Sequence, residues 1–196
     1  MLLDYYRVLD ELHGRLRPAT YLEIGVHEGD SLALCRSGTR AIGVDPALPG
    51  CLRAEVEAEL VAATSDEFFA DHEPVAIDLA FIDGLHLFEQ ALRDFVNVER
   101  WAAPGATVLV HDCIPIDAET SSRERTTVVW SGDVWKVVAC LRDHRPDLSI
   151  DIVDVPPTGL AVITGLDPTS TVLADRFDEL VTAYVPLTFD DFVSRS

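Results

Sequence analysis

Basic residues are scarce in this chain. Its 196 residues include 15 lysines and arginines against 34 aspartates and glutamates, and its formal net charge at pH 7 is −19. An acidic surface of this kind repels the phosphate backbone of nucleic acids and the headgroups of anionic membranes. We therefore expect neither as a partner, whereas a neutral or cationic small molecule is easier to accommodate.

Long apolar runs and paired cysteines are also missing. No apolar run reaches the roughly 18 residues that a membrane helix needs, and residues 1–17 have neither the basic leader nor the apolar core of a signal peptide. Four cysteines, Cys35, Cys51, Cys113 and Cys140, form no C-x-x-C pair, which argues against a zinc site and a disulfide scaffold. These absences favour a protein of the reducing cytoplasm.

The length and composition suit a single domain. A chain of 196 residues that is 48% hydrophobic and 25% charged can bury a full core but leaves little for a second domain. We expect an N-terminal helix over 1–17, a core over 20–163, and a C-terminal helix and tail over 170–196. The apolar side of this last helix would cap the core or bind a second subunit of a homo-oligomer.

Short apolar stretches alternate along the core with helical patterns, which predicts a Rossmann-like, doubly wound and mostly parallel seven-stranded sheet with helices on both faces. The last two strands are joined only by residues 154–159, too few for a crossover helix, so we expect an antiparallel hairpin there. The expected strands are 21–25, 41–45, 59–63, 77–83, 107–112, 149–153 and 160–163, and the expected helices inside the core are 29–36, 88–96 and 134–141.

One connection of this sheet is longer than usual. The polar stretch 113–127 has no clear periodicity and follows the fifth expected strand. Ligands of such sheets bind beyond the carboxyl ends of the strands, so a long connection there is a candidate lid.

The turn after the first strand has the composition of a nucleotide site. Glu23 ends the strand, and Gly25 and Gly29 follow, where missing side chains let a ligand approach the backbone and the next helix. Asp45 closes the second strand, where a carboxylate can accept hydrogen bonds from both hydroxyls of a ribose. His27 stands where a dinucleotide fingerprint requires its second glycine, which disfavours a pyrophosphate. We expect a nucleoside cofactor at this turn.

Carboxylates and imidazoles gather at two other strand ends. Asp83 follows the fourth strand, His86 comes three residues later, and His111 and Asp112 end the fifth strand. Groups that converge from two strand ends can bind a divalent cation or share proton transfer. The alternatives are a helix N-cap for Asp83, a supporting or adenine-side position for His86, and purely structural roles for His111 and Asp112.

The motifs over 20–163 resemble those of class I methyltransferases that depend on S-adenosylmethionine (SAM), whose first motif is an acidic residue followed by G-x-x-x-G. The resemblance implies that Glu23, Gly25 and Gly29 lie along the amino-acid end of SAM, and that Asp45 holds its ribose.

The same resemblance extends to the third strand end. Ser65 and Asp66 match the family position beside the adenine, although an ordinary helix cap explains them equally well. Asp83 borders both halves of the expected cleft, so we count it with the cofactor residues as well as with the catalytic ones.

The second half of the pattern resembles bacterial sugar and antibiotic-precursor O-methyltransferases and, more distantly, the metal-dependent catechol type. By that resemblance Asp83 and Asp112 are metal ligands, His111 is a third ligand, and His86 takes the place of the base. His111 replaces a carboxylate of the family, and imidazole is a poor ligand for Mg²⁺. Mn²⁺, Fe²⁺, Zn²⁺ or no metal at all therefore stay open beside Mg²⁺.

The resemblance implies SAM-dependent O-methylation of a small hydroxylated molecule, such as a sugar or a natural-product intermediate, with metal assistance left open. Two alternatives remain: a tailoring enzyme of the same fold with another reaction, and a non-catalytic partner that binds SAM or nothing. Trp130, near the start of a helix, is either a substrate contact or part of the core.

Overall fold

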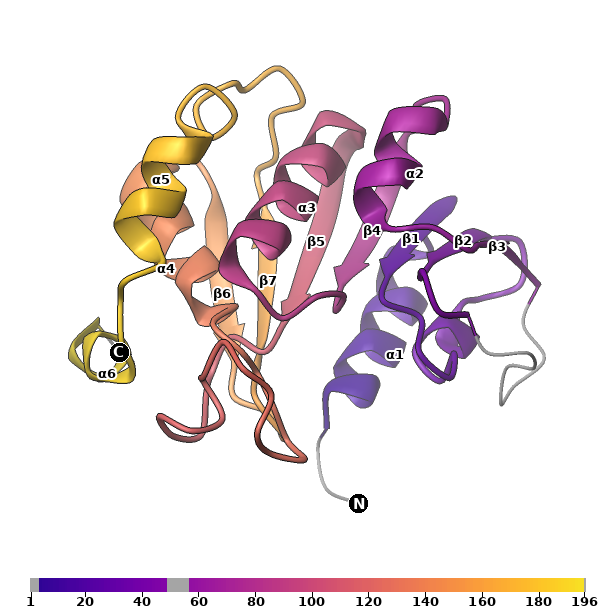
Figure 1. The fold of residues 1–196 in the computed structure, drawn as a ribbon. Helices are drawn as coiled ribbons and strands as arrows, with labels where there is room; N and C mark the ends of the chain where they lie inside the picture. Colours follow the sequence, from indigo (N-terminus) through magenta and orange to yellow (C-terminus); the bar gives the residue numbers. More distant parts are fainter. Residues whose placement is uncertain (1–3, 49–56, 196) are drawn as a thin grey trace.

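A seven-stranded sheet runs through the middle of the computed structural model, which describes residues 4–48 and 57–195 (Figure 1). The strand order is β3-β2-β1-β4-β5-β7-β6. Strands β1 to β5 pair in parallel, whereas β7 is antiparallel to both β5 and β6. The strands are β1 (Thr20–Ile24), β2 (Arg40–Val44), β3 (Ala58–Val61), β4 (Ile77–Ile82), β5 (Ala102–His111), β6 (Ser149–Val153) and β7 (Leu160–Thr164). The predicted sheet with its terminal hairpin is confirmed.

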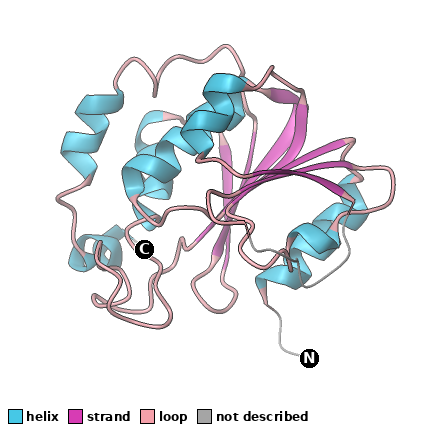
Figure 2. Cartoon of the chain, turned by 45° about the vertical axis from the view of Figure 1, so that its right-hand side comes forward, coloured by secondary structure: helices cyan, strands magenta, loops and turns pink. Residues whose placement is uncertain are grey.

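The central strands are covered on both faces, which is why they read as near-continuous apolar runs. In β4, every residue except Asp78 is buried. One face packs on α1 and on the short helix η1, and the other on α2 to α5 (Figure 2). The helices are α1 (Tyr5–Leu16), η1 (Leu32–Leu34), α2 (Ser65–Asp71), α3 (Phe88–Arg100), α4 (Trp135–His144), α5 (Phe177–Tyr184) and α6 (Phe189–Arg195). None of the helices in the described residues is long and apolar enough to cross a membrane.

The helix predicted over 29–36 is wrong in extent, because only the 3-10 helix η1 forms there. Gly29 has φ +84 and Gly38 has φ +90, so left-handed backbone stands on either side of the segment. Between them, the Ser31 hydroxyl is turned inward to a buried carboxylate. These constraints leave room for little more than one turn.

The C-terminal helix was predicted to begin near Ser170, and this predicted start is also wrong. Residues 172–176 form turns, and Val172 is 43% exposed, so the apolar side of the helix is not continuous there. Helix α5 begins only at Phe177, and a second short helix, α6, follows it.

The parallel strands direct their carboxyl ends to one edge of the sheet, where the connections after β1, β2, β4 and β5 meet. The longest of them, the 112–134 loop, contains neither helix nor strand. The predicted irregular connection is therefore confirmed, whereas its role as a lid remains a prediction.

Candidate active site

A cleft of about 740 Å³ lies at the carboxyl edge of the sheet. Its walls come from α1, from the strand ends of β1, β2, β4 and β5, from the start of α2, and from the 112–134 loop. Among the described residues, six carboxylate side chains and a single arginine line it. Its volume lies within the range of about 300–1,000 Å³ that is usual for small-molecule sites.

The glycine turn after β1 is tied to the end of β2. The Asp45 carboxylate accepts the backbone N–H of His27 at 3.0 Å and that of Ala47 at 2.8 Å. Gly25, Gly29 and His27 all have positive φ, with values of +90, +84 and +48. Gly25 and Asp45 line the cleft, as the sequence suggested, but the cleft walls do not include Gly29.

Gly25 has a steric role that the sequence did not reveal. A Cβ built on Gly25 would lie 2.1 Å from the backbone oxygen of Asp83, at the end of the neighbouring strand β4. The absent side chain therefore lets two strand ends approach each other, and it brings the glycine turn close to Asp83.

We expect Gly25→Ala to destabilise the fold by about 3 kcal/mol or more, because a strained φ and a backbone clash add together. The matched control is Gly38→Ala, since Gly38 has the same φ of +90 and no atom within 4 Å of its built Cβ. That control should lose only about 1–2 kcal/mol. Denaturant unfolding measures both, and equal losses would show that the contact with Asp83 is unimportant.

Glu23 lies beneath the glycine turn and is not part of the cleft wall. Its carboxylate is fully buried and accepts the hydroxyls of Tyr21 and Ser31, both at 2.7 Å. Burial raises the pKa of Glu23 to about 8, although the two hydroxyl hydrogen bonds oppose the shift. The structure thus places Glu23 as a support of the turn.

Ser65 and Asp66 open α2 and line the cleft. Thr64 precedes them as the N-cap and forms a capping box with Glu67, so the segment is both a helix cap and a wall of the cleft. From α3, the Gln90 side chain donates to both residues at 3.1 Å.

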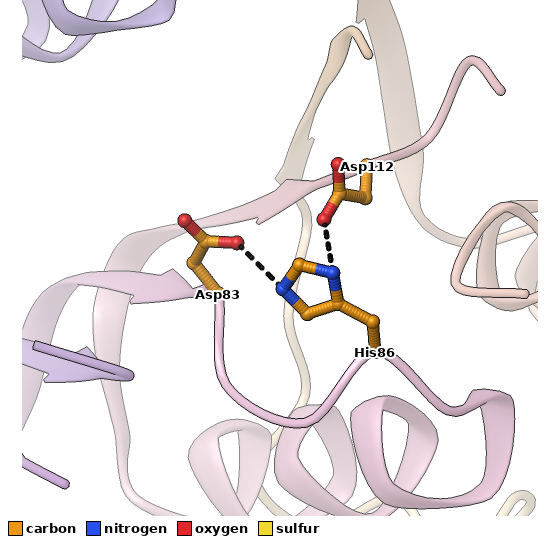
Figure 3. A group of neighbouring side chains, drawn as sticks. All are labelled: Asp83, His86 and Asp112. Carbon is orange, nitrogen blue, oxygen red and sulfur yellow. Dashed lines mark ion pairs between the residues drawn. The ribbon is translucent and has the colours of Figure 1, made fainter. Parts of the chain in front are cut away.

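Asp83, His86 and Asp112 converge at the other end of the cleft (Figure 3). His86 Nε2 lies 3.5 Å from Asp83 Oδ1, and His86 Nδ1 lies 2.9 Å from Asp112 Oδ2. The Trp130 carbonyl is closer still to Nδ1, at 2.7 Å, and a carbonyl can only accept. His86 Nδ1 therefore carries a proton that it donates to Trp130, and Nε2 is the nitrogen that faces Asp83.

His111 stands behind this group. Its Nδ1 lies 3.1 Å from Asp83 Oδ1 and 3.7 Å from Asp112 Oδ1. Asp112 has φ +63 and accepts the Thr158 hydroxyl on Oδ1. His111 Nε2 is buried without a hydrogen-bond partner among the described residues, whereas Asp112 Oδ2 has the ion-pair contact with His86 Nδ1. Buried polar atoms are rarely left without a partner, which favours a ligand at His111 Nε2.

In this cluster the carboxylates and the imidazoles stabilise each other's charged forms. Burial opposes the charged form of Asp83, but His111 and His86 outweigh it and hold the pKa of Asp83 at about 2. Burial likewise opposes the charged form of His86, but the two carboxylates outweigh it and raise its pKa to about 10. Asp83 and Asp112 thus stabilise a positive charge placed between them, either that of an imidazolium or that of a metal ion.

The ligand atoms of Asp83, His86 and Asp112 lie within 4.8 Å of one another, a spacing that can hold a metal ion. The prediction had grouped Asp83 and Asp112 with His111 and had kept His86 as the base. The structure brings both imidazoles to the same carboxylates. They differ in accessibility, since the His86 side chain is 23% exposed and that of His111 is 7% exposed.

Trp130 belongs to the cleft, as the substrate-side prediction suggested. Its ring stacks on His86 with centroids 5.0 Å apart, and its Nε1 donates to the Ser122 carbonyl at 2.6 Å. The loop is fastened to the rest of the protein by Arg123, which pairs with Glu89 of α3 and with Asp133, at 2.6 Å in each case. These contacts hold the loop beside His86, at the end of the cleft where Asp83 and Asp112 converge.

Among the cleft residues that the sequence did not reveal are two tyrosines and an arginine. Tyr5 and Tyr6 line the cleft from α1, and the centroid of the Tyr5 ring lies 4.2 Å from that of His111. Nothing in the sequence showed that α1 reaches the strand ends. Arg125, the single cleft arginine among the described residues, lies on the 112–134 loop, where the sequence has no periodicity to guide a prediction.

Comparison with known proteins gives a family match over part of the chain. Residues 22–113 match a family described as "Methyltransferase domain". A search of curated proteins gave no match.

Solved structures with the same fold include three methyltransferases. The O-methyltransferase from Bacillus cereus, in complex with SAH, has 13% identity and a TM-score of 0.64, covering 82% of this chain and 80% of that one. TomG from Streptomyces achromogenes, an O-methyltransferase involved in tomaymycin synthesis and bound to SAM, has 15% identity and a TM-score of 0.60, covering 82% and 78%. SAH-bound PaMTH1 from Podospora anserina has 15% identity and a TM-score of 0.62, covering 81% and 76%.

Proposed function

We propose that this chain, whose residues 22–113 match a methyltransferase domain, transfers the methyl group of SAM to a hydroxyl group of a small molecule. The observation that carries the proposal is a single cleft with two ends. One end joins the Gly25 turn to Asp45, and the other joins Asp83, His86 and Asp112.

The charge of the cleft favours SAM over a dinucleotide. Six carboxylates face it among the described residues, with one arginine. SAM carries a sulfonium cation, whereas a pyrophosphate would add negative charge to an already acidic wall. The neighbours named above that contain SAM or SAH support the same choice. When bound, SAM supplies an activated methyl group, and Asp45 is placed to hold its ribose.

The donor set at the catalytic end fits a divalent metal ion. Asp83 and Asp112 would hold it, with an imidazole as third ligand, and His111 Nε2 beside them is buried without a hydrogen-bond partner among the described residues. Such a set of two carboxylates and one imidazole suits Mn²⁺, Fe²⁺ or Zn²⁺ better than Mg²⁺. The metal would lower the pKa of the acceptor hydroxyl and orient it.

The two histidines take different roles in this proposal. An acceptor can reach only an accessible imidazole, so His86 would be the base, through Nε2, while the more buried His111 supports the carboxylates or the metal. Because Asp83 and Asp112 raise the pKa of His86 to about 10, this role requires a cation on the two carboxylates, which would lower that pKa. The Trp130 ring stacks on the His86 ring, and the Trp130 carbonyl accepts a hydrogen bond from Nδ1, so in the neutral imidazole Nε2 is the nitrogen that can receive a proton.

Methyl transfer is an in-line displacement that depends on alignment and on the exclusion of water. The 112–134 loop is suited to both tasks, because Arg123 fastens it to α3 and Trp130 lies over the base. Acceptor contacts would come from this loop and from Tyr5 and Tyr6 of α1. The geometry suits a small hydroxylated acceptor such as a sugar or a natural-product intermediate.

Calorimetric titration with SAM tests the cofactor half. We expect micromolar binding, on the order of −8 kcal/mol, and a loss of at least about tenfold in Asp45→Ala, because two charged hydrogen bonds to the ribose disappear. Glu59→Ala is the control, since Glu59 lies on the edge strand β3 and pairs with Arg40 outside the cleft.

The titration is repeated with Asp45→Asn, whose single amide oxygen can still accept one of the two backbone N–H groups of the turn, and with Mn²⁺ or Zn²⁺ added. If SAM binds in none of these conditions to a folded protein, the chain is not a SAM-dependent methyltransferase. A role in binding a partner protein then becomes the better account. SAM binding without methyl transfer to any labelled hydroxylated acceptor would instead point to another tailoring reaction on the same fold.

A further inference from the structure

A second cavity lies on the α4 side of the sheet and shares no residue with the cleft. Its volume is about 600 Å³, and it lies between α4, β6 and α6, with the two residues after Asp112 as a further wall. This volume is again that of a small-molecule site. Its walls are mainly apolar and include Cys113, Ile114, Trp135, Val138, Ala139, Ile152 and Phe192.

Three charged residues line this cavity, and they differ in whether they have a partner. Asp143 accepts the Tyr184 hydroxyl at 2.6 Å and pairs with Arg195 at 2.9 Å, so its charge is already satisfied. Arg142, on the same stretch of α4, makes no ion pair or hydrogen bond with any other described residue. The chain as a whole has a net charge of −19. This mainly apolar cavity differs from that acidic background, because the charged lining residue without an ion pair to another described residue is the arginine Arg142.

From these observations we propose that the second cavity binds an amphipathic monocarboxylate, with its apolar body between α4 and α6 and its carboxylate on Arg142. The planar guanidinium of arginine matches a carboxylate, which it binds through two hydrogen bonds. A dianionic phosphate is disfavoured, because a single arginine would leave one of its charges facing an acidic protein.

Entry into the cavity requires little rearrangement. Helix α6 closes it through Phe192, whose ring lies 5.4 Å from that of Trp135, and through Arg195. No residue of α6 is fully buried, so moving this helix exposes little core, although it separates Phe192 from Trp135 and Arg195 from Asp143. The site is distinct from the proposed methyl transfer site and does not depend on it.

Calorimetric titration of the full chain with decanoate, below its micelle concentration, tests the proposal, with the uncharged 1-decanol as the matched probe. We expect decanoate to bind at micromolar concentration and Arg142→Gln to weaken it at least about tenfold, while binding of 1-decanol stays unchanged. Arg100→Gln is the control, since Arg100 is exposed at the end of α3, and it should leave decanoate binding intact.

A filled cavity gives the second test. Val138→Trp places a large ring in the cavity and should abolish the binding of both probes. Because Val138 is only 6% exposed and this variant could fail to fold, Ala139→Leu is the milder substitution, with unfolding and SAM titration as checks. The proposal is overturned if decanoate does not bind, if a folded filled variant still binds it, or if Arg100→Gln weakens it as much as Arg142→Gln.

Discussion

Asp83→Asn is expected to lower the rate of methyl transfer by about 10²- to 10³-fold at saturating SAM, because the amide can neither stabilise a positive charge nor hold a metal ion as the carboxylate does. Asp83 Oδ1 lies 3.5 Å from His86 and 3.1 Å from His111, so this one change alters the surroundings of both imidazoles. Single-turnover transfer of a labelled methyl group from SAM measures the effect.

The control for this prediction is Asp78→Asn. Asp78 lies on the same strand, β4, but near its other end, where it accepts the backbone N–H of Thr20. We expect the rate with that variant to match the wild type. A titration with Mn²⁺ should show weaker binding in Asp83→Asn alone.

The result also separates the two roles assigned to Asp83. If the substitution weakens SAM binding and leaves the rate at saturation unchanged, Asp83 is a cofactor residue and the catalytic assignment is wrong. If it lowers the rate but leaves the Mn²⁺ affinity intact, the carboxylate acts on His86 and the metal site lies elsewhere.

Much of the fold followed from local patterns, because each central strand is a short apolar run that ends in a glycine or an aspartate. The hairpin of β6 and β7 was predictable for the same reason, since the connection between them is too short for a helix. The errors arose where side chains override periodicity, as in η1, where Ser31 turns inward to Glu23.

The site was predictable as far as strand topology brings residues together. The carboxyl ends of neighbouring parallel strands meet, so Asp83 of β4 and Asp112 of β5 had to lie close to each other. Contacts from outside the sheet could not be foreseen in this way. The position of Tyr5 depends on how α1 packs, and the stacking of Trp130 on His86 depends on the path of an irregular loop.

Glu23 is the residue for which sequence and structure suggest different roles. The motif implies a cofactor contact, whereas the structure buries its carboxylate between Tyr21 and Ser31 and leaves it out of the cleft wall. In the folded protein its pKa is about 8, compared with an ordinary value of 4.5. Between these values the folded state holds a proton that the unfolded state has released.

The contribution of Glu23 to stability therefore falls as pH rises through this window, by about 1.4 kcal/mol per pH unit. We expect Glu23→Gln to unfold like the wild type near pH 5 and to be more stable by up to about 3 kcal/mol at pH 7. The glutamine amide can accept the Tyr21 hydroxyl and donate to Ser31, as the protonated acid does.

Urea unfolding at several pH values from 5 to 8 measures this difference, and the comparison of the two proteins cancels the titration of all other groups. The SAM affinity of Glu23→Gln should stay within about threefold of the wild type, a difference of less than 1 kcal/mol. If the variant is equally stable at every pH and loses SAM, the carboxylate is ionised and serves the cofactor directly. In that case the motif, and not the buried geometry, describes its role.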